Sequence, residues 1–346
     1  MMAFGEKAVR VFDKLGKART IGEEISRGGE GAVYALVGQP SAVVKLYHPE
    51  LLARRGDQLR EKVDAMVGFR QKIDTSALAW PAVTVHDEHG AWRGYAMRRA
   101  AGTPLAKLAH PMLCRKHVPG LDRRDVVRYL LAIVTTLGRL HHAGVCLGDI
   151  NLNNFLYDHA TGAVTLIDCD SYQVAIDGRI FPCLVGAADM IPPEHHGLNL
   201  AEVRRTPESD LFSLAILIFR CLMLGRHPYD FVGGGTVVEN LRSGHFPYGT
   251  GGAPPGRDGA IPAGPWYLIW SHLTFALKTL LIRTLLNGAG NPAERARPSE
   301  WRIAFDKYAH SLEQGSHDRA LRPMTQKPAE RRIAISGDQA SARQAS

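Results

Sequence analysis

The stretch LGDINLNNFL at residues 147–156, followed by LIDCD at 166–170, decides how the rest of the chain is interpreted. It places Asp149, Asn154 and Asp168 on either side of a short hydrophobic segment. Carboxylate and amide oxygens in this order are able to hold a metal ion and a hydroxyl group together. The same residue types are also ordinary turn formers, because their side chains hydrogen-bond to nearby backbone. The surrounding sequence has to distinguish a reaction site from a pair of turns.

The composition predicts a large folded protein in a reducing compartment. With 346 residues, of which 45% are hydrophobic, the chain can bury a substantial core as one large domain or as two lobes. The five cysteines are scattered and form no CxxC pair, which argues against a disulfide framework or a zinc site. The opening MMAFGEKAVRVF lacks the apolar run of a signal peptide. We therefore expect a cytoplasmic location.

Neither a membrane nor a nucleic acid is the expected partner. The longest apolar run, LFSLAILIFRCLML at residues 211–224, is too short to span a bilayer and contains Arg220, so it predicts a buried core helix. The net charge of +8 and the pI of about 9.3 are compatible with nucleic-acid or phosphate binding. However, the basic residues are spread along the chain rather than gathered in one run. A solvated surface is the favoured interpretation.

Two patterns divide the chain. Short β-branched and aromatic segments bounded by turn residues run through the first part, interrupted by one helical stretch at 51–70. Helices dominate the second part, as in the segment 122–144, which begins with Asp and ends with Gly. The prediction is an α+β fold with a small β-rich lobe and a larger helical lobe. The expected divisions are an N-terminal extension at 1–18, a small lobe at 19–100, a large lobe at 101–312 with a Gly/Pro-rich loop at 232–265, and a disordered tail at 313–346.

Two segments of the small lobe are suggestive of anion binding. The segment ISRGGEGAVYAL at 25–36 carries Gly28, Gly29 and Gly31, which allow the backbone to approach a bulky anion. Its alternative interpretation is a simple hairpin turn. The next strand, AVVKLY, carries Lys45, which either faces the same anion or points to solvent.

The order of these features favours phosphoryl transfer from ATP. A Gly-rich hairpin, a strand lysine and a helix with acidic residues precede the three polar residues of the stretch 147–170. The transferred phosphoryl group carries dispersed negative charge, so it requires backbone donors, a cation and metal ions around it. The acceptor hydroxyl requires a carboxylate that orients it and takes its proton.

On these motifs the chain resembles the protein kinase superfamily, over roughly residues 20–312. The resemblance matches Asp149 to the catalytic aspartate, and Asn154 and Asp168 to the two metal-binding residues. It matches PPE at 192–194 to the APE motif. The structural residues that it implies are Asp210, as the buried aspartate of the following long helix, and Glu194 paired with Arg297 of RPSEW.

The same resemblance implies an ATP site with Mg²⁺ or Mn²⁺. Lys45 is expected to contact the α- and β-phosphates and to pair with Glu61 on the following helix. Asp57 and Asp64 are the alternatives, because the helix register is not fixed by the sequence. Met97 corresponds to the gatekeeper at the back of the pocket. The residues placed around the nucleotide are Ser26, Gly28, Gly29, Glu30, Gly31, Val33, Lys45, Glu61, Met97, Arg98 and Arg99, with Arg98 to Ala100 as the hinge.

More narrowly, the motifs GDINxNN, DCDSY and RPSEW resemble those of a divergent bacterial serine/threonine kinase group. Some members carry helix-hairpin-helix regions that bind DNA. Others are encoded beside a metal-dependent phosphatase and a von Willebrand A protein, which makes these two proteins the partners that the resemblance implies. No helix-hairpin-helix segment follows residue 312 here, so nucleic-acid binding is not carried over.

Several positions depart from the kinase pattern. Ser26 replaces the first glycine of the phosphate-covering loop, and Gly148 replaces the arginine of the HRD triplet. Asn151 stands where a lysine usually contacts the transferred phosphate. Asp170 replaces the glycine of DFG and adds a third carboxylate, which is either a further metal ligand or a like charge that weakens nucleotide binding.

The segment from Asp168 to Glu194 has only two hydroxyl side chains, Ser171 and Tyr172, both directly after DCD. With Gly148 in place of the arginine that would grip a phosphate, activity is predicted to be independent of phosphorylation in this segment.

Three functions remain in competition. The preferred one is an active serine/threonine kinase with an unusual catalytic loop. The second is a pseudokinase that binds nucleotide or partner proteins, which Asn151 and Asp170 support. The third is a small-molecule kinase, against which PPE, Asp210 and Arg297 stand as parts of a protein-substrate platform.

Adjacent histidines and scattered tryptophans have ordinary explanations. His141-His142 and His195-His196 are not expected to bind metal, since neighbours on a helix point to different faces. The expected role of Trp266, Trp270 and Trp301 is core packing.

Overall fold

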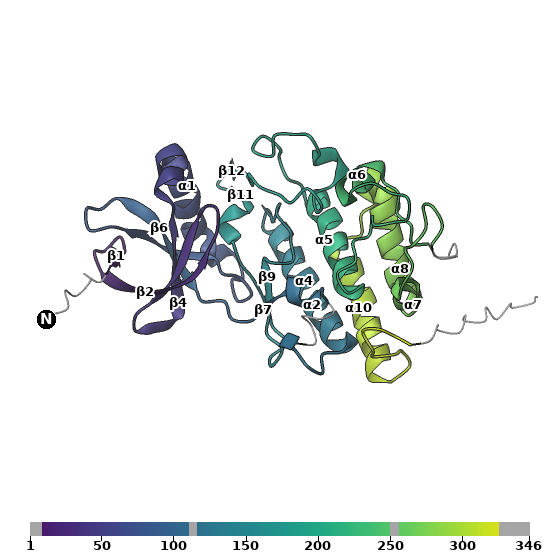
Figure 1. The fold of residues 1–346 in the computed structure, drawn as a ribbon. Helices are drawn as coiled ribbons and strands as arrows, with labels where there is room; N and C mark the ends of the chain where they lie inside the picture. The colour runs from purple at the N-terminus through teal and green to yellow at the C-terminus, as the bar shows by residue number, and fades with distance from the viewer. Residues whose placement is uncertain (1–8, 111–115, 250–255, 325–346) are drawn as a thin grey trace, which may run out of the picture.

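Two lobes make up the part of the chain that the computed structural model describes, which is residues 9–110, 116–249 and 256–324 (Figure 1). The N-terminal lobe consists of strands with one long helix beside them, and the C-terminal lobe is mostly helical. This mixed α and β content, with its β-rich part first, is consistent with a kinase-like fold.

Six antiparallel strands of the N-terminal lobe close into a barrel, in the order β1-β2-β3-β4-β6-β5. The barrel closes where Phe12 of β1 pairs with His86 of β5. Side chains alternate along β4, so that Val44 packs inside the barrel while Val43 and Tyr47 pack on the layer toward the following helix. The strands are β1 Arg10–Phe12, β2 Ala18–Arg27, β3 Gly31–Leu36, β4 Gln39–Tyr47, β5 Pro81–His86 and β6 Trp92–Arg98.

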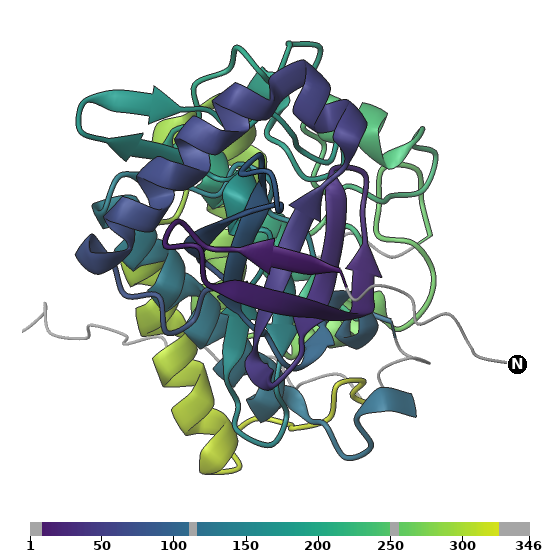
Figure 2. The same ribbon diagram turned by 90° about the vertical axis from the view of Figure 1, so that its left-hand side faces the viewer.

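Helix α1 (Pro49–Phe69) crosses one side of this barrel, as Figure 2 shows. Pro49 opens the helix, at a position where its missing N–H has no intrahelical partner to lose. Leu59 and Val63 are buried against the strands. Because each residue turns a helix by about 100°, Lys62 faces inward beside Val63 whereas Glu61 faces out.

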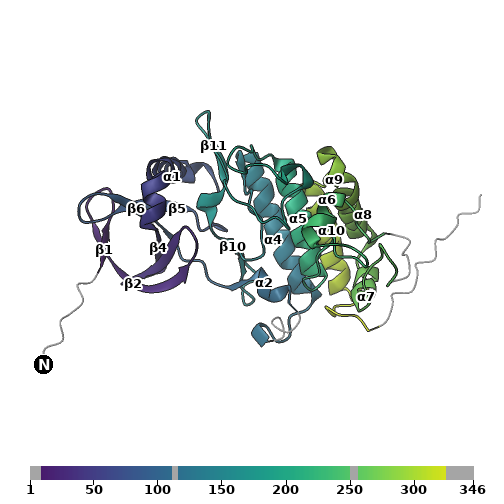
Figure 3. The ribbon, with the colours of Figure 1, turned by 45° about the horizontal axis from the view of Figure 1, so that its top comes forward.

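Two small sheets lie at the junction of the lobes, where Figure 3 shows β10 and β11. The stretch 147–154 connects β8 to β9, and the stretch 167–172 connects β10 to β11, so both segments singled out in the sequence are loops at this junction. One sheet contains β7 Thr103–Pro104, β9 Phe155–Tyr157 and β10 Val164–Leu166; the other contains β8 Val145–Cys146, β11 Gln173–Ile176 and β12 Arg179–Phe181.

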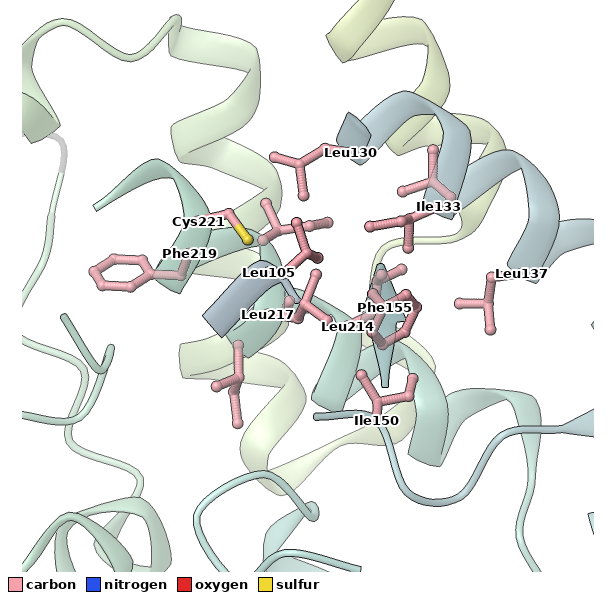
Figure 4. Packing of buried hydrophobic residues seen from close by; sticks show 14 of the residues in the cluster. Leu105, Leu130, Ile133, Leu137, Ile150, Phe155, Leu214, Leu217, Phe219 and Cys221 are labelled. Carbon is pink, nitrogen blue, oxygen red and sulfur yellow. The ribbon is translucent and has the colours of Figure 1, made fainter. Parts of the chain in front are cut away.

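The core of the C-terminal lobe forms between α4 (Arg123–His142) and α5 (Pro207–Leu222). Both helices begin with a capping box, in which the N-cap side chain and the residue three positions later satisfy each other's backbone N–H groups. Figure 4 shows Leu130, Ile133 and Leu137 of α4 packed near Leu214 and Leu217 of α5. The predicted buried helix at 211–224 is confirmed in α5.

Among the described residues, no helix is both long and apolar enough to cross a membrane. The remaining helices are η1 Arg70–Lys72, α2 Leu105–Leu108, η2 Cys169–Ser171, η3 Pro193–His195, α6 Val237–Ser243, α7 Trp266–Ser271, α8 Phe275–Ile282, η4 Arg283–Asn287, α9 Gly288–Gly290, η5 Pro292–Glu294 and α10 Pro298–Glu313.

The structure differs from the expected divisions at three places. Strand β1 lies inside the predicted extension 1–18 and is part of the barrel. Helix α6 lies inside the predicted loop 232–265, capped by Thr236 and Glu239. The predicted disordered tail begins with a packed segment, because the backbone carbonyl of Arg319 accepts a hydrogen bond from the backbone N–H of Arg123. Residues 325–346 of that tail, and 1–8 and 250–255 of the other two segments, lie outside the described residues.

Candidate active site

A cavity of about 780 Å³ lies where the two lobes meet, and most of the predicted site residues line it. It takes walls from the β2–β3 hairpin, from β4 and β6, and from the two junction loops. Glu61 and Asp170 are the predicted site residues that do not line it. Those that do are Ser26, Gly28, Gly29, Glu30, Gly31, Val33, Lys45, Met97, Arg98, Arg99, Asp149, Asn154 and Asp168.

The Gly-rich segment is both a hairpin turn and a wall of the cavity. The backbone N–H of Gly28 donates to the carbonyl of Gly31 at 2.9 Å, which closes the turn between β2 and β3. A Cβ on Gly31 would lie 2.3 Å from the carbonyl oxygen of Leu46, so the neighbouring strand leaves room for glycine alone. A Cβ on Gly29 would meet nothing within 4 Å. The hairpin tip therefore leaves space for a ligand beside its backbone.

Lys45 points into the protein and not to solvent. Its side chain is 8% exposed, and its Nζ donates to Asp168 Oδ1 at 2.7 Å and to Asp170 Oδ2 at 2.8 Å. Burial by itself lowers the pKa of Lys45, but the two carboxylates more than offset this effect and raise the pKa above its usual value. A fixed cation thus stands at the inner end of the cavity.

The predicted partner of Lys45 on the helix is wrong. Glu61 is exposed and accepts a hydrogen bond from Arg179 of β12 at 2.5 Å. The alternative Asp64 pairs with Lys14 at 2.8 Å. Asp57 lines a different surface depression, on the outer part of α1. The reason is helix register, because the inward position is occupied by Lys62 and the acids are rotated away.

Asp170, which the sequence left open as either a further metal ligand or a like charge, takes the place that the sequence analysis gave to a helix acid. Its Oδ1 accepts from Lys45 at 2.9 Å and from the Tyr95 hydroxyl at 2.7 Å, while its Oδ2 accepts from the Tyr47 hydroxyl at 2.6 Å. The side chain is 2% exposed. Burial acts to raise the pKa of Asp170, but Lys45 and the two tyrosines lower it to about 2. These three donors account for hydrogen bonds to both carboxylate oxygens.

Sequence reasoning missed both tyrosines. Tyr47 lies two residues from Lys45 on β4, and therefore on the same face of the strand. That spacing could have identified Tyr47 as a neighbour of the Lys45 side chain. Tyr95 pairs directly with Lys45 across the ladder of β4 and β6, which only the strand register shows.

Asp168, which lines the interlobe cavity, has an unusual backbone conformation. Its φ of 58° and ψ of 36° place it in the left-handed region. The hydroxyl of Ser171 donates to its carbonyl oxygen at 2.8 Å, which fixes the short helix η2 behind it. Its side chain keeps 38% exposure. Burial and the nearby charge of Asp170 raise its pKa.

Asp149 lies at the other end of the cavity among amide donors. Asn151 Nδ2 donates to its Oδ2 at 3.0 Å, and Asn154 Nδ2 donates to the same oxygen at 3.2 Å. Partial burial raises the pKa of Asp149 above its usual value, against the effect of these hydrogen bonds. Its carboxylate is therefore a better proton acceptor than one in water.

Asp210 fixes the backbone that carries Asp149. The Asp210 side chain is 1% exposed and accepts from the backbone N–H groups of Leu147 and Gly148, at 2.7 and 2.8 Å. His141 Nε2 contacts the same carboxylate at 3.0 Å. The loop is thus anchored to the start of α5, in the place that the resemblance assigns to this aspartate.

Arg205, which sequence reasoning did not identify, lies where an arginine at position 148 would lie. Gly148 has a φ of 71°, and a Cβ there would be 2.7 Å from the Cys183 Sγ and 3.3 Å from the Cγ of Arg205. Arg205 is buried, contacts the Nδ1 of His195 at 2.8 Å and donates to the carbonyl of Val185 at 2.9 Å. A permanent cation therefore braces the segment that follows β12.

The ion pair of Glu194 forms with Arg295 and not with Arg297 as predicted. Arg295 is fully buried and donates to both carboxylate oxygens, at 2.7 and 2.8 Å. Burial acts to raise the pKa of Glu194, but Arg295 lowers it. Arg297 instead stands at the N-terminus of α10, where its backbone N–H donates to Glu300 at 2.9 Å. Because Arg297 is the N-cap residue of α10, it does not contact Glu194. Arg295, two residues earlier, forms the ion pair instead.

The donor set fits a small hard cation. Asp168 and Asn154 offer carboxylate and amide oxygens to the same cavity. In the described part of the chain, no group of three or more His, Cys, Asp or Glu side chains is arranged to hold a metal by itself. Mg²⁺ commonly uses one or two protein carboxylates, water and substrate phosphates, so these two residues suit it when a nucleotide is bound.

The histidines and tryptophans considered in the sequence analysis contact other protein groups. His195 contacts Arg205, and His196 contacts the carbonyl of Ile191 at 3.3 Å. Trp270 and Trp301 are buried in the core, as predicted, and Trp266 is half-buried with Arg226 over its ring at 5.2 Å.

The fold and the site together are consistent with a kinase-like fold, with Lys45, Asp168 and Asp149 around one interlobe cavity. No protein-family model matches the chain. Curated proteins that it resembles include two named Protein kinase YegI, from Escherichia coli strain K12 and Escherichia coli O157:H7. Each is 32% identical, over 227 residues (65% of this chain) and 225 residues (64%) respectively. The match covers 34% of each relative, so this chain spans about a third of their length.

Proposed function

We propose that this protein is an ATP-dependent kinase that transfers the γ-phosphoryl group to serine or threonine hydroxyls of a protein substrate. The observation that carries the proposal is the convergence of Lys45, Asp149 and Asp168 on one cavity from three separate segments. The similarity to proteins named as protein kinases points the same way.

In this proposal each residue has a role that its surroundings support. Lys45 binds the α- and β-phosphates, since it is the buried cation at the inner end of the cavity. Asp168 and Asn154 hold Mg²⁺ or Mn²⁺, which neutralises charge on the phosphates when it is bound. Asp149 orients the acceptor hydroxyl and accepts its proton, a role that its raised pKa favours.

A second cavity gives the acceptor a route to Asp149. Its volume is about 560 Å³, and it shares Asp149, Asn153 and Val185 with the nucleotide cavity. Its floor is formed by the segment after β12, which the buried pair of Glu194 and Arg295 ties to the helical lobe. A groove along that segment suits an extended polypeptide better than a small molecule.

A nucleotide-binding pseudokinase is the second candidate, and one contact favours it. Lys45 forms hydrogen bonds with both Asp168 and Asp170, so the metal-type aspartate is engaged by the lysine before any ligand arrives. If that contact persisted with nucleotide bound, the metal would lack its main ligand.

Incubation with labelled ATP, Mg²⁺ or Mn²⁺ and a generic protein substrate tests the proposal. Wild type should transfer label to serine or threonine, and Asp149→Asn should not. Asp177→Asn is the matched control, because Asp177 is 81% exposed on the β11–β12 turn and lies outside both cavities. Nucleotide binding with equal background transfer in all three proteins would establish the pseudokinase instead. Transfer to small alcohols alone would establish a small-molecule kinase.

We also propose that the reaction takes place in the cytoplasm. The four cysteines within the described residues, Cys146, Cys169, Cys183 and Cys221, are free thiols, which suits a reducing compartment.

A further inference from the structure

The partner of Lys45 comes from an unexpected part of the chain. Helix α1 presents Lys62 at its inward position, where an acid would be needed to pair with Lys45. Lys62 is buried and donates to the carbonyl of Pro182 at 3.0 Å. The carboxylate that meets Lys45 belongs instead to Asp170, in the short helix η2.

A separate cavity lies between helix α1 and this carboxylate. About 450 Å³ of space lies between α1 and the segment after Asp168, lined by Lys62 and Leu59 on one side and by Asp170 and Phe181 on the other. Pairing across this space with the helix would require α1 to move. The observed pairing within the junction requires no such movement.

We propose that Asp170 is the positioning residue for Lys45, and that it replaces the helix acid of the kinase pattern. This inference rests on the proposed function, since it assigns Lys45 to the nucleotide phosphates. Tyr47 and Tyr95 hold the Asp170 carboxylate from the β4 and β6 strands, so the lysine and its partner form one rigid unit with the barrel. The acid of this unit therefore does not come from α1, although Tyr47 and Tyr95 pack in one hydrophobic cluster with that helix.

The two carboxylates that share Lys45 have different roles. Asp170 is 2% exposed and its oxygens are occupied by three donors, whereas Asp168 is 38% exposed and lines the nucleotide cavity. When a nucleotide and its metal enter, Asp168 exchanges Lys45 for the metal, and Asp170 keeps the lysine in place. Asp168 is thus the metal ligand, and Asp170 acts through Lys45.

Binding of ATP, measured by calorimetry with Mg²⁺ and again with EDTA, separates these roles. Asp170→Asn should weaken ATP binding about tenfold in both conditions, because a charged hydrogen bond that orients Lys45 is lost. The gain in affinity on adding Mg²⁺ should be unchanged. Asp168→Asn should lose that gain, and Asp177→Asn should resemble wild type. Loss of the Mg²⁺ gain in Asp170→Asn would make Asp170 a metal ligand and overturn the proposal.

A purely structural role for Asp170 is tested in the Lys45→Met background. If Asp170 acts through Lys45, adding Asp170→Asn there should not weaken ATP binding further. It should also raise the melting temperature relative to Lys45→Met alone, because it removes a buried carboxylate charge that has lost its cation and keeps only the two tyrosine hydroxyls. A further loss of ATP affinity equal to that in wild type would contradict the proposal. Tyr47→Phe and Tyr95→Phe supply milder variants, each expected to weaken binding about two- to tenfold.

Because these experiments measure binding, a protein that binds ATP but transfers no phosphate would refute the proposed function and leave this inference standing.

Discussion

The two ends of the nucleotide cavity are held in different ways. At the end that contains Asp149, the loop keeps Asp149 and Asn154 at the spacing of the kinase pattern, although Gly148 and Asn151 depart from it, and backbone hydrogen bonds to Asp210 anchor the loop. At the end that contains Lys45, the lysine lies at the expected position along the chain, but its partner is Asp170 and not an acid of helix α1. A catalytic loop whose geometry is set by its own backbone keeps its residues in order. An ion pair is less constrained, because any nearby segment is able to supply the acid.

The largest expected effect comes from the end that contains Asp149. Asp149→Asn should lower kcat by about 10²–10⁴-fold while leaving ATP affinity nearly unchanged, because proton acceptance matters in the transition state and not in nucleotide binding. Steady-state kinetics together with calorimetry measure both quantities. Equal turnover in wild type and Asp149→Asn would contradict the catalytic role proposed for Asp149.

The Glu194 ion pair should give the next largest effect, on stability. Arg295→Ala removes a fully buried guanidinium and leaves Glu194 without its partner. This change should lower the free energy of unfolding by about 3 kcal/mol. The value lies at the low end of the range for broken buried ion pairs, because Glu194 is partly exposed. Arg297→Ala is the matched control and should cost less than about 1 kcal/mol. Urea unfolding measures both, and the reverse order of effects would contradict the structural assignment.

Acid should loosen the acceptor side of the site. His227 bridges two backbone groups, since its Nε2 contacts the carbonyl of Asp189 at 2.8 Å and its Nδ1 accepts from the N–H of Tyr229 at 3.3 Å. Burial lowers the pKa of His227 to about 4. The folded state thus binds this proton less readily than the unfolded state. The contribution to stability is complete above about pH 6.5, the ordinary histidine value, and is lost as the pH falls toward 4.

The full loss for His227 corresponds to about 3 kcal/mol. Urea unfolding at several pH values between 4 and 7.5 measures it, and His227→Gln should flatten the profile. His195 should act in the same direction, because burial and the nearby Arg205 lower its pKa. A pH profile in His227→Gln as steep as that of wild type would exclude this residue as the cause.

Removing phosphate from the segment 168–194 should have no effect. Ser171 and Tyr172 are both buried, and the Ser171 hydroxyl already donates to the carbonyl of Asp168. The buried guanidinium of Arg205 already contacts His195 and donates to the carbonyl of Val185, so this arginine has partners in the segment without a phosphate. Phosphatase-treated protein, checked by mass spectrometry, should be active at once. A lag in activity that is abolished by Ser171→Ala with Tyr172→Phe would contradict this expectation.

The fold was predictable where the sequence patterns are long and regular. The helix from Arg123 was marked by its Asp cap and its Gly stop, and the buried helix around Leu214 by its continuous apolar run. Strand β1 was assigned to the N-terminal extension because three residues carry too little pattern. This strand is fixed by its neighbours β2 and β5 in the barrel, and not by its own sequence.

The sequence by itself determined the residues whose geometry depends on short segments of backbone. Asp149 and Asn154 lie in one loop, so their spacing alone brought them together. Only the tertiary structure decided the partners of the buried charges, because Lys45 and Asp170 are 125 residues apart and Glu194 and Arg295 are 101 apart. A rotation of about 100° along α1 was enough to exclude Glu61. The direction of such a side chain depends on how the helix packs, and the spacing of residues in the sequence does not determine it.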